Sequence, residues 1–149
     1  MSMYHVLTPA QFHAREFHAS KINILFTFDD GYQSWIDVCL PVLTSYNIHG
    51  LFFINSGLLD VATDQVAVET YMRQQLRIEP KKPLTWNGAQ VLVDAGHTIG
   101  GHTVSHPDLT TLPLAGALKE IQKDKQVLEL RLGVVVTDFA YPFGRKKKL

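Results

Sequence analysis

The stretch Ile22-Asn-Ile-Leu-Phe-Thr-Phe-Asp-Asp-Gly31 decides the fold class, because a mainly apolar run stops abruptly at two carboxylates. Residues 22–28 are rich in β-branched and aromatic types, which is typical of a strand buried on both faces, as in a parallel sheet. In parallel α/β folds the carboxyl ends of the strands form the functional face. Asp29 and Asp30 are therefore expected at that face.

The rest of the chain alternates between strand and helix patterns. Short apolar runs predict further strands over 50–54, 96–100 and 134–140. Helices are predicted over 32–46 with a kink or break at Pro41, over 85–95 with Thr85 as N-cap and Gly96 as stop, and over 113–132 with Gly133 as stop. Residues 1–20 are expected to be irregular or partly helical, and 58–83 to be an insertion with a helix near 72–75. The alternation predicts an α/β fold built on a parallel sheet or barrel.

Composition excludes several classes of protein. A chain of 149 residues with 46% hydrophobic and 19% charged residues suits one globular domain. Lys+Arg and Asp+Glu both number 14, so no global basic field attracts nucleic acid or an anionic membrane. The basic run Arg145-Lys-Lys-Lys148 is interpreted as a solvated tail. Cys39 is the single cysteine, which excludes an intramolecular disulfide, and it is expected to be a buried hydrophobic residue.

Neither a membrane span nor a secretory signal is evident in the sequence. No run approaches about 18 consecutive apolar residues, and the first ten residues lack a basic region followed by an apolar one. The chain as given is therefore expected to be cytoplasmic, or extracytoplasmic if an export signal has been removed from it.

Three polar clusters follow predicted strands. Asp29 and Asp30 end the first, His102-Thr-Val-Ser-His106 follows the third, and Tyr141-Pro-Phe-Gly144 follows the fourth. Taken singly, Asp-Gly is common turn chemistry, and two histidines four residues apart are often surface residues. Taken together, two imidazoles and a carboxylate make a ligand set for Zn²⁺ or another divalent ion, with the second Asp as a general base. The combination favours a metal site.

The same residues carry a family resemblance. Thr27-Phe-Asp-Asp-Gly31, His102-Thr-Val-Ser-His106 and Phe139-Ala-Tyr-Pro-Phe-Gly144 resemble, in order, the first three motifs of the polysaccharide deacetylases, also called carbohydrate esterase family 4 or the NodB-homology domain. The resemblance implies a distorted (β/α) barrel that removes N- or O-acetyl groups from carbohydrate. It divides the chain into a lead-in (1–21), an incomplete deacetylase-like domain (22–144) and a basic tail (145–149).

The resemblance also implies a role for each motif residue. Asp29 would be the catalytic base, and Asp30, His102 and His106 would hold one divalent metal ion, with Zn²⁺ as the expected ion. The backbone N–H of Phe143 would stabilise the oxyanion formed at the acetyl carbonyl. The substrate-binding residues would be Tyr141, Pro142 and Gly144.

The chain departs from the family pattern in two respects. Ala140 stands where many members have an Arg that steadies the base, and no Leu-x-His motif, which supplies a general acid, follows the third motif. About four predicted strands make roughly half of a barrel. Three explanations stay open: a truncated deacetylase, a chain completed by a partner, or a non-catalytic metal- or glycan-binding protein. A small-molecule amidohydrolase is a further alternative.

An open sheet of this size would leave strand edges unpaired. Self-association into a homo-oligomer is therefore expected, with the contact at the carboxyl-terminal segment or an edge strand near 134–140.

Overall fold

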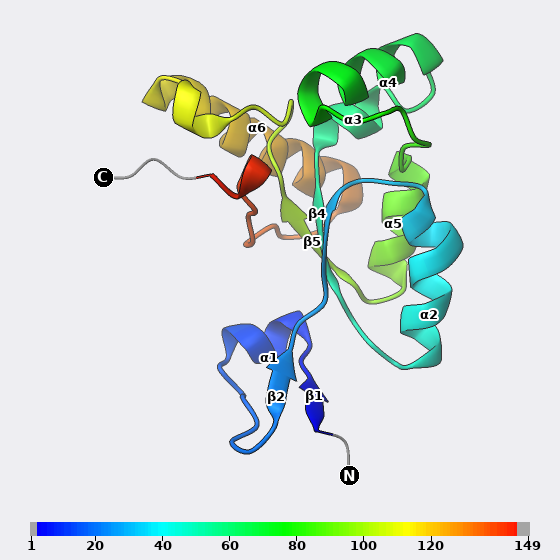
Figure 1. Cartoon of the computed structure of the whole chain (residues 1–149), viewed down its shortest axis with the longest axis vertical. Coiled ribbons are helices and arrows are strands. Elements are labelled where there is room, and N and C mark those ends of the chain that lie inside the picture. The colour runs from blue at the N-terminus through cyan, green and yellow to red at the C-terminus, as the bar shows by residue number, and fades with distance from the viewer. Residues whose placement is uncertain (1–2, 146–149) are drawn as a thin grey trace.

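The main sheet of the computed structural model, which describes residues 3–145, is parallel throughout (Figure 1). Its strands are β3 (Thr27–Asp30), β4 (Leu51–Ile54) and β5 (Thr98–Gly101), in the order β3-β4-β5. β4 is central and buried at every position. The register pairs Asp30 with Ile54 and Ile54 with Gly101, so the three strands end at one level. Parallel pairing and alternating helices confirm the predicted α/β class, and the described strands do not close into a barrel.

A second, two-stranded parallel sheet precedes the main one. β1 (Tyr4–Val6) pairs with β2 (Ile22–Ile24), and α1 (Pro9–His13) connects them, forming the unit at the lower end of Figure 1. The prediction of one strand over 22–28, buried on both faces, is wrong. The run divides into β2 and β3, and Ile22 and Phe26 are 53% and 37% exposed. Both strands lie at sheet edges, where neighbours cover them incompletely. Within residues 1–20, the helix was expected and β1 was not.

Helices from several parts of the chain pack against the face of the main sheet that carries Phe52, Ile54 and Ile99. α5 (Trp86–Asp94) begins at Thr85, whose hydroxyl accepts the Gly88 N–H, as predicted. α6 (Leu114–Leu132) ends at Gly133 in the left-handed conformation that a C-terminal glycine suits. The predicted helix over 32–46 is a π-helix (Trp35–Cys39) that continues into α2 (Leu40–Ser45), with Pro41 in the first turn of α2. The apolar residues of this segment are not all buried, since Val38 and Val42 are 60% and 52% exposed.

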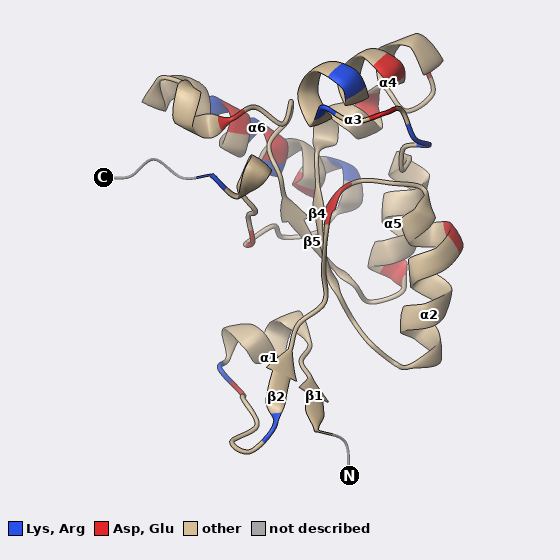
Figure 2. Cartoon of the chain, in the orientation of Figure 1, with Lys and Arg blue, Asp and Glu red and all other residues tan. Residues whose placement is uncertain are grey.

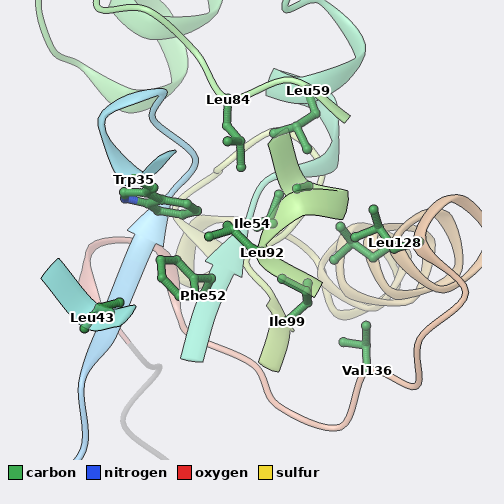
Figure 3. Close-up of a cluster of buried hydrophobic side chains, with 12 residues drawn as sticks. Trp35, Leu43, Phe52, Ile54, Leu59, Leu84, Leu92, Ile99, Leu128 and Val136 are labelled. Carbon is green, nitrogen blue, oxygen red and sulfur yellow. The ribbon is translucent and has the colours of Figure 1, made fainter. Parts of the chain in front are cut away.

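The core lies between the sheet and these helices (Figure 3). Phe52 and Ile54 of β4 are fully buried against Leu92 of α5 and Leu128 of α6. The predicted insertion, 58–83, holds a small apolar cluster of its own: Leu58, Val68, Met72 and Leu76. It contains most of α3 (Ser56–Asp60), α4 (Gln65–Tyr71) and a π-helix (Met72–Leu76), which confirms the helix expected near 72–75. The insertion therefore has a small apolar core of its own.

The predicted strand over 134–140 is wrong. Within it, Phe139 forms an isolated parallel bridge with Gly101. The physical reason lies at Val136, whose N–H donates to Glu129 and whose carbonyl accepts from the Lys125 ammonium. Side chains of α6 thus satisfy the backbone groups that a strand neighbour would otherwise pair with, despite the β-propensity of three consecutive valines.

Charge and hydropathy add little to the sequence-based picture. Figure 2 shows acidic and basic residues interspersed along α6, and acidic residues where β3 ends. Among the described helices, none combines the length and the apolar character that crossing a membrane requires.

Candidate functional site

The predicted polar clusters meet at one edge of the main sheet. β3 delivers Asp30, and β5 leads into the segment 102–106. The segment 139–144 joins them through Gly101, whose N–H donates to the Asp138 carbonyl (2.9 Å) and whose carbonyl accepts the Ala140 N–H (3.0 Å). Parallel strands of matched register explain why residues more than 70 positions apart in sequence come together here.

Asp30, His102 and His106 form a compact group of donor atoms. The Asp30 Oδ1 lies 3.5 Å from the His102 Nε2 and 3.4 Å from the His106 Nε2, and the ligand atoms all lie within 4.8 Å of one another. Both imidazoles are almost fully buried, whereas the Asp30 side chain is 22% exposed. The group is therefore enclosed on the protein side and reachable from solvent.

Backbone carbonyls orient the two imidazoles. The His102 Nδ1 lies 2.8 Å from the Ala140 carbonyl, and the His106 Nδ1 lies 3.4 Å from the Gln75 carbonyl. A proton on each Nδ1 leaves Nε2 as the free acceptor, which faces Asp30. Burial lowers the pKa of the His102 imidazole, but the Asp30 carboxylate and the Ala140 carbonyl outweigh it and raise that pKa overall. Burial, with the charge of His102, lowers the pKa of His106.

Asp30 is held in an uncommon backbone conformation, with φ of 85°. Thr103, His106 and Phe143 also have positive φ, of 70°, 52° and 58°. Such conformations cost about 1–3 kcal/mol each and gather at functional sites. The Tyr32 hydroxyl donates to Asp30 Oδ2 (2.6 Å). Burial opposes the charge on Asp30, but hydrogen bonds from His102 and Tyr32 prevail and hold its pKa below the ordinary value.

Asp29 lies on the exposed side of β3, next to this group. Desolvation raises its pKa, the positive charge of His102 lowers it, and the charge of Asp30 raises it again, with a net rise. A carboxylate with a raised pKa is a better proton acceptor than an ordinary one. The position and the direction of this shift suit a general base.

The segment 141–144 forms one wall of the site. The Phe143 ring centroid lies 4.6 Å from that of His106, and the Arg77 guanidinium lies 4.9 Å above the Phe143 ring. Tyr141 and Gly144 are exposed and Pro142 is buried. Arg145, the first residue of the expected basic tail, pairs with Asp108 at 2.7 Å while its side chain stays 59% exposed. Residues 146–149 lie outside the described part of the chain.

Sequence reasoning missed several groups that touch the site. Tyr32 belongs to none of the three motifs. The contacts of Gln75 and Ala140 are made by their backbone carbonyls, so the identity of their side chains does not indicate them. Asn55 donates to the carbonyls of His102 and Thr103. A separate signal existed for Asp124, an acidic residue four positions before Leu128 and therefore on the apolar side of α6.

Asp124 is a fully buried carboxylate that accepts the N–H groups of Ser56 and His102, each at 2.9 Å. Burial raises its pKa to about 6, although these hydrogen bonds oppose the rise. The loops that follow β4 and β5 are thus joined to α6 through one side chain.

Comparison with known proteins agrees with the resemblance. A family model for polysaccharide deacetylases matches residues 18–149. A chitin deacetylase of Pestalotiopsis sp is 30% identical over 117 residues, which are 78% of this chain and 33% of that protein. An uncharacterised 30.6 kDa protein of Geobacillus stearothermophilus is 30% identical over 103 residues, which are 68% of this chain and 30% of that protein. The chain spans about a third of the length of these curated relatives.

Solved structures show the same fold. The Streptococcus pyogenes deacetylase PplD, in complex with acetate, superposes with a TM-score of 0.77 at 22% identity, over 97% of this chain and 57% of that chain. A de-N-acetylase from Aggregatibacter actinomycetemcomitans gives a TM-score of 0.75 at 18% identity, over 97% of this chain and 65% of that chain. The predicted partial NodB-type fold is therefore confirmed. With the family model matching most of its length, the chain belongs to the polysaccharide deacetylase family.

Proposed function

We propose that the site binds one divalent metal ion and hydrolyses acetyl groups on N- or O-acetylated carbohydrate. The observation that supports this most directly is the approach of one carboxylate oxygen and two imidazole nitrogens to within 4.8 Å of one another. The family supplies the class of reaction, a hydrolysis of a non-peptide amide or an ester.

The donor set fits a divalent ion of the zinc type. Zinc sites that perform catalysis take a few imidazole and carboxylate ligands and keep a position open. Here the two Nε2 atoms and Asp30 Oδ1 face one another, and the carbonyls of Ala140 and Gln75 set the tautomers that leave Nε2 free. When bound, the ion supplies Lewis acidity and makes water more acidic.

Residues of the chain supply the base and the contact to the oxyanion, and none of them is assigned as the acid that protonates the leaving group. Asp29 takes a proton from the attacking water, for which its raised pKa suits it. The backbone N–H of Phe143 donates to the oxygen that becomes negative when water adds to the acetyl carbonyl. Tyr141, Pro142 and Gly144 are proposed to contact the sugar, with Tyr141 half exposed beside the site.

Paired substrates test the proposal on the 149-residue chain. Loaded with Zn²⁺, it is expected to hydrolyse an activated acetate ester faster than an N-acetylated chitooligosaccharide. An amine must be protonated to leave, and a positioned acid contributes about 10²–10⁴-fold. Asp29→Asn should abolish the ester hydrolysis while the metal stays bound. Asp37→Asn is the matched control, because Asp37 is an exposed carboxylate on the neighbouring π-helix.

Three results discriminate the alternatives. Metal bound with no hydrolysis of either substrate supports the non-catalytic binding protein. Hydrolysis of small cyclic or formyl amides in preference to acetylated sugars supports an amidohydrolase. Unchanged activity of Asp29→Asn contradicts the assignment of the base.

A further inference from the structure

Helix α6 presents two carboxylates to the segment that carries both histidines. Glu120 and Asp124 are four residues apart, so they lie one above the other on the same face of the helix. Both side chains bind backbone N–H groups of residues 102–105. The helix thus contacts the histidine segment near both of its ends.

Asp124 binds the start of the segment. Its Oδ2 accepts the His102 N–H at 2.9 Å, and its Oδ1 accepts the Ser56 N–H at 2.9 Å. The side chain is fully buried, so both hydrogen bonds form away from water, where a charged acceptor is strongest. Gly101 leaves room for this contact, because a Cβ there would lie 3.0 Å from Asp124 Oδ2.

Glu120 binds the other end. Its Oε2 accepts the Ser105 N–H at 2.9 Å, and its Oε1 accepts the Ser105 hydroxyl at 3.0 Å. Within the segment, the Thr103 hydroxyl accepts the His106 N–H at 3.1 Å. These contacts hold the backbone at His102 and Ser105, next to Thr103 and His106, whose positive φ values cost free energy.

We propose that Asp124 and Glu120 are positioning residues that preset His102 and His106 for metal binding by fixing the backbone of the segment between them. The inference rests on the proposed metal site. Elsewhere on its buried side, α6 packs through Leu128 and Leu132, so packing alone needs no carboxylate. The two acids are placed where the histidine backbone offers N–H groups, which an apolar side chain could not accept.

Metal affinity tests this directly. Asp124→Asn and Glu120→Gln each replace one acceptor oxygen by an NH₂ group, which cannot accept a backbone N–H. Each variant is expected to bind Co²⁺, followed by its visible absorption, about 10–100-fold more weakly, the range found for groups that orient metal ligands. The matched control is Glu129→Gln on the same helix, since the Glu129 carboxylate accepts the Val136 N–H at 3.0 Å, away from the site. Its Co²⁺ affinity should stay at the wild-type value.

Hydrogen exchange in metal-free protein supplies a readout that needs no metal. Asp124→Asn should speed exchange of the Ser56 amide, and Glu120→Gln that of Ser105, at a temperature below the unfolding of each variant. The His102 amide is a weaker reporter, because it also donates to the Ile54 carbonyl at 3.1 Å. Exchange in the core strand β4 should not change. If Asp124→Asn does not fold, Glu120→Gln, whose side chain is half-buried, carries the test alone.

The two proposals fail separately. The positioning role is overturned if both acid variants bind Co²⁺ with wild-type affinity. If only Glu120→Gln folds, wild-type affinity in that variant overturns it, and in either case the metal site stands. A loss of affinity in Glu129→Gln as large as in the other two also overturns it, because the effect would then be general to the helix. Wild-type protein that binds no Co²⁺ overturns the proposed metal site, and this inference with it.

Discussion

Gly57 lies where α3 touches the histidine segment, and replacing it with alanine should disturb the site through the backbone. The Gly57 N–H donates to the Val104 carbonyl at 3.1 Å. An added Cβ would overlap the Val104 carbonyl oxygen and lie 3.2 Å from its carbon and 3.3 Å from the Tyr71 ring. Val104 cannot yield freely, because the Tyr71 hydroxyl also donates to its carbonyl at 2.7 Å.

The expected change in the free energy of unfolding follows from opposing contributions. Overpacking costs about 1–3 kcal/mol, and weakening the hydrogen bond costs about 0.5–1.5 kcal/mol. The gain from alanine over glycine in a helix is about 0.5–1 kcal/mol. The free energy of unfolding should therefore fall by about 0.5–4 kcal/mol, which lowers the melting temperature by about 1–16 °C for a chain of this size. The histidine segment shifts with Val104, so metal affinity should fall too.

The assay is thermal unfolding followed by circular dichroism, with a Co²⁺ titration below the transition. Gly116→Ala is the control, because a Cβ at Gly116 in α6 meets nothing closer than 3.8 Å and should stabilise the helix by about 0.5–1 kcal/mol. A Gly57→Ala variant that melts at or above the wild-type temperature and binds metal normally would refute the reasoning.

Three further outcomes are expected. Thr85→Ala removes the acceptor for the Gly88 N–H at the start of α5 and should cost about 1 kcal/mol in urea unfolding, whereas an unchanged midpoint would contradict the cap. Burial raises the pKa of the Cys39 thiol, so less thiolate is present at pH 8 in the folded protein than in the unfolded protein. A disulfide reagent should therefore react more slowly with the folded protein, and equal rates would contradict this. Residues 134–140, expected as an edge strand at a contact between copies, form no strand, so the outer edge of β3, which pairs with no further strand among residues 3–145, is proposed in their place. Self-association should give a dimer or larger species in sedimentation at micromolar concentration, and a compact monomer would be evidence against it.

Local chemistry made part of the fold predictable. Thr85 and Gly133 mark helix ends by capping, which acts within a few residues, and the structure has them where the sequence indicated. The run 22–28 shows the limit of prediction from local sequence. Its composition suits a buried strand, but whether neighbours cover it depends on residues far along the chain. The strand predicted over 134–140 was wrong for a similar reason, since Glu129 and Lys125 of α6 form hydrogen bonds with the backbone N–H and carbonyl of Val136.

The residues of the candidate site also divide into those that the sequence could predict and those that it could not. A carboxylate near His102 and His106 was predictable, because residue types, spacing and the ends of parallel strands converge on one arrangement. The choice of Asp30 over Asp29 as the ligand came from the family resemblance. Tyr32 and Glu120 were not, because a phenol or a carboxylate at a helix or loop position has no pattern of its own. Contacts through backbone carbonyls, such as Ala140, leave no trace in the sequence at all.

Anomalous X-ray scattering at the zinc edge, from crystals grown with Zn²⁺, tests the central claim most directly. We expect one peak about 2.0–2.2 Å from the Nε2 atoms of His102 and His106 and from a carboxylate oxygen of Asp30, with Asp29 outside bonding distance. A peak bound by Asp29 in place of Asp30, or zinc bound only at other histidines such as His5 or His18, would contradict the account.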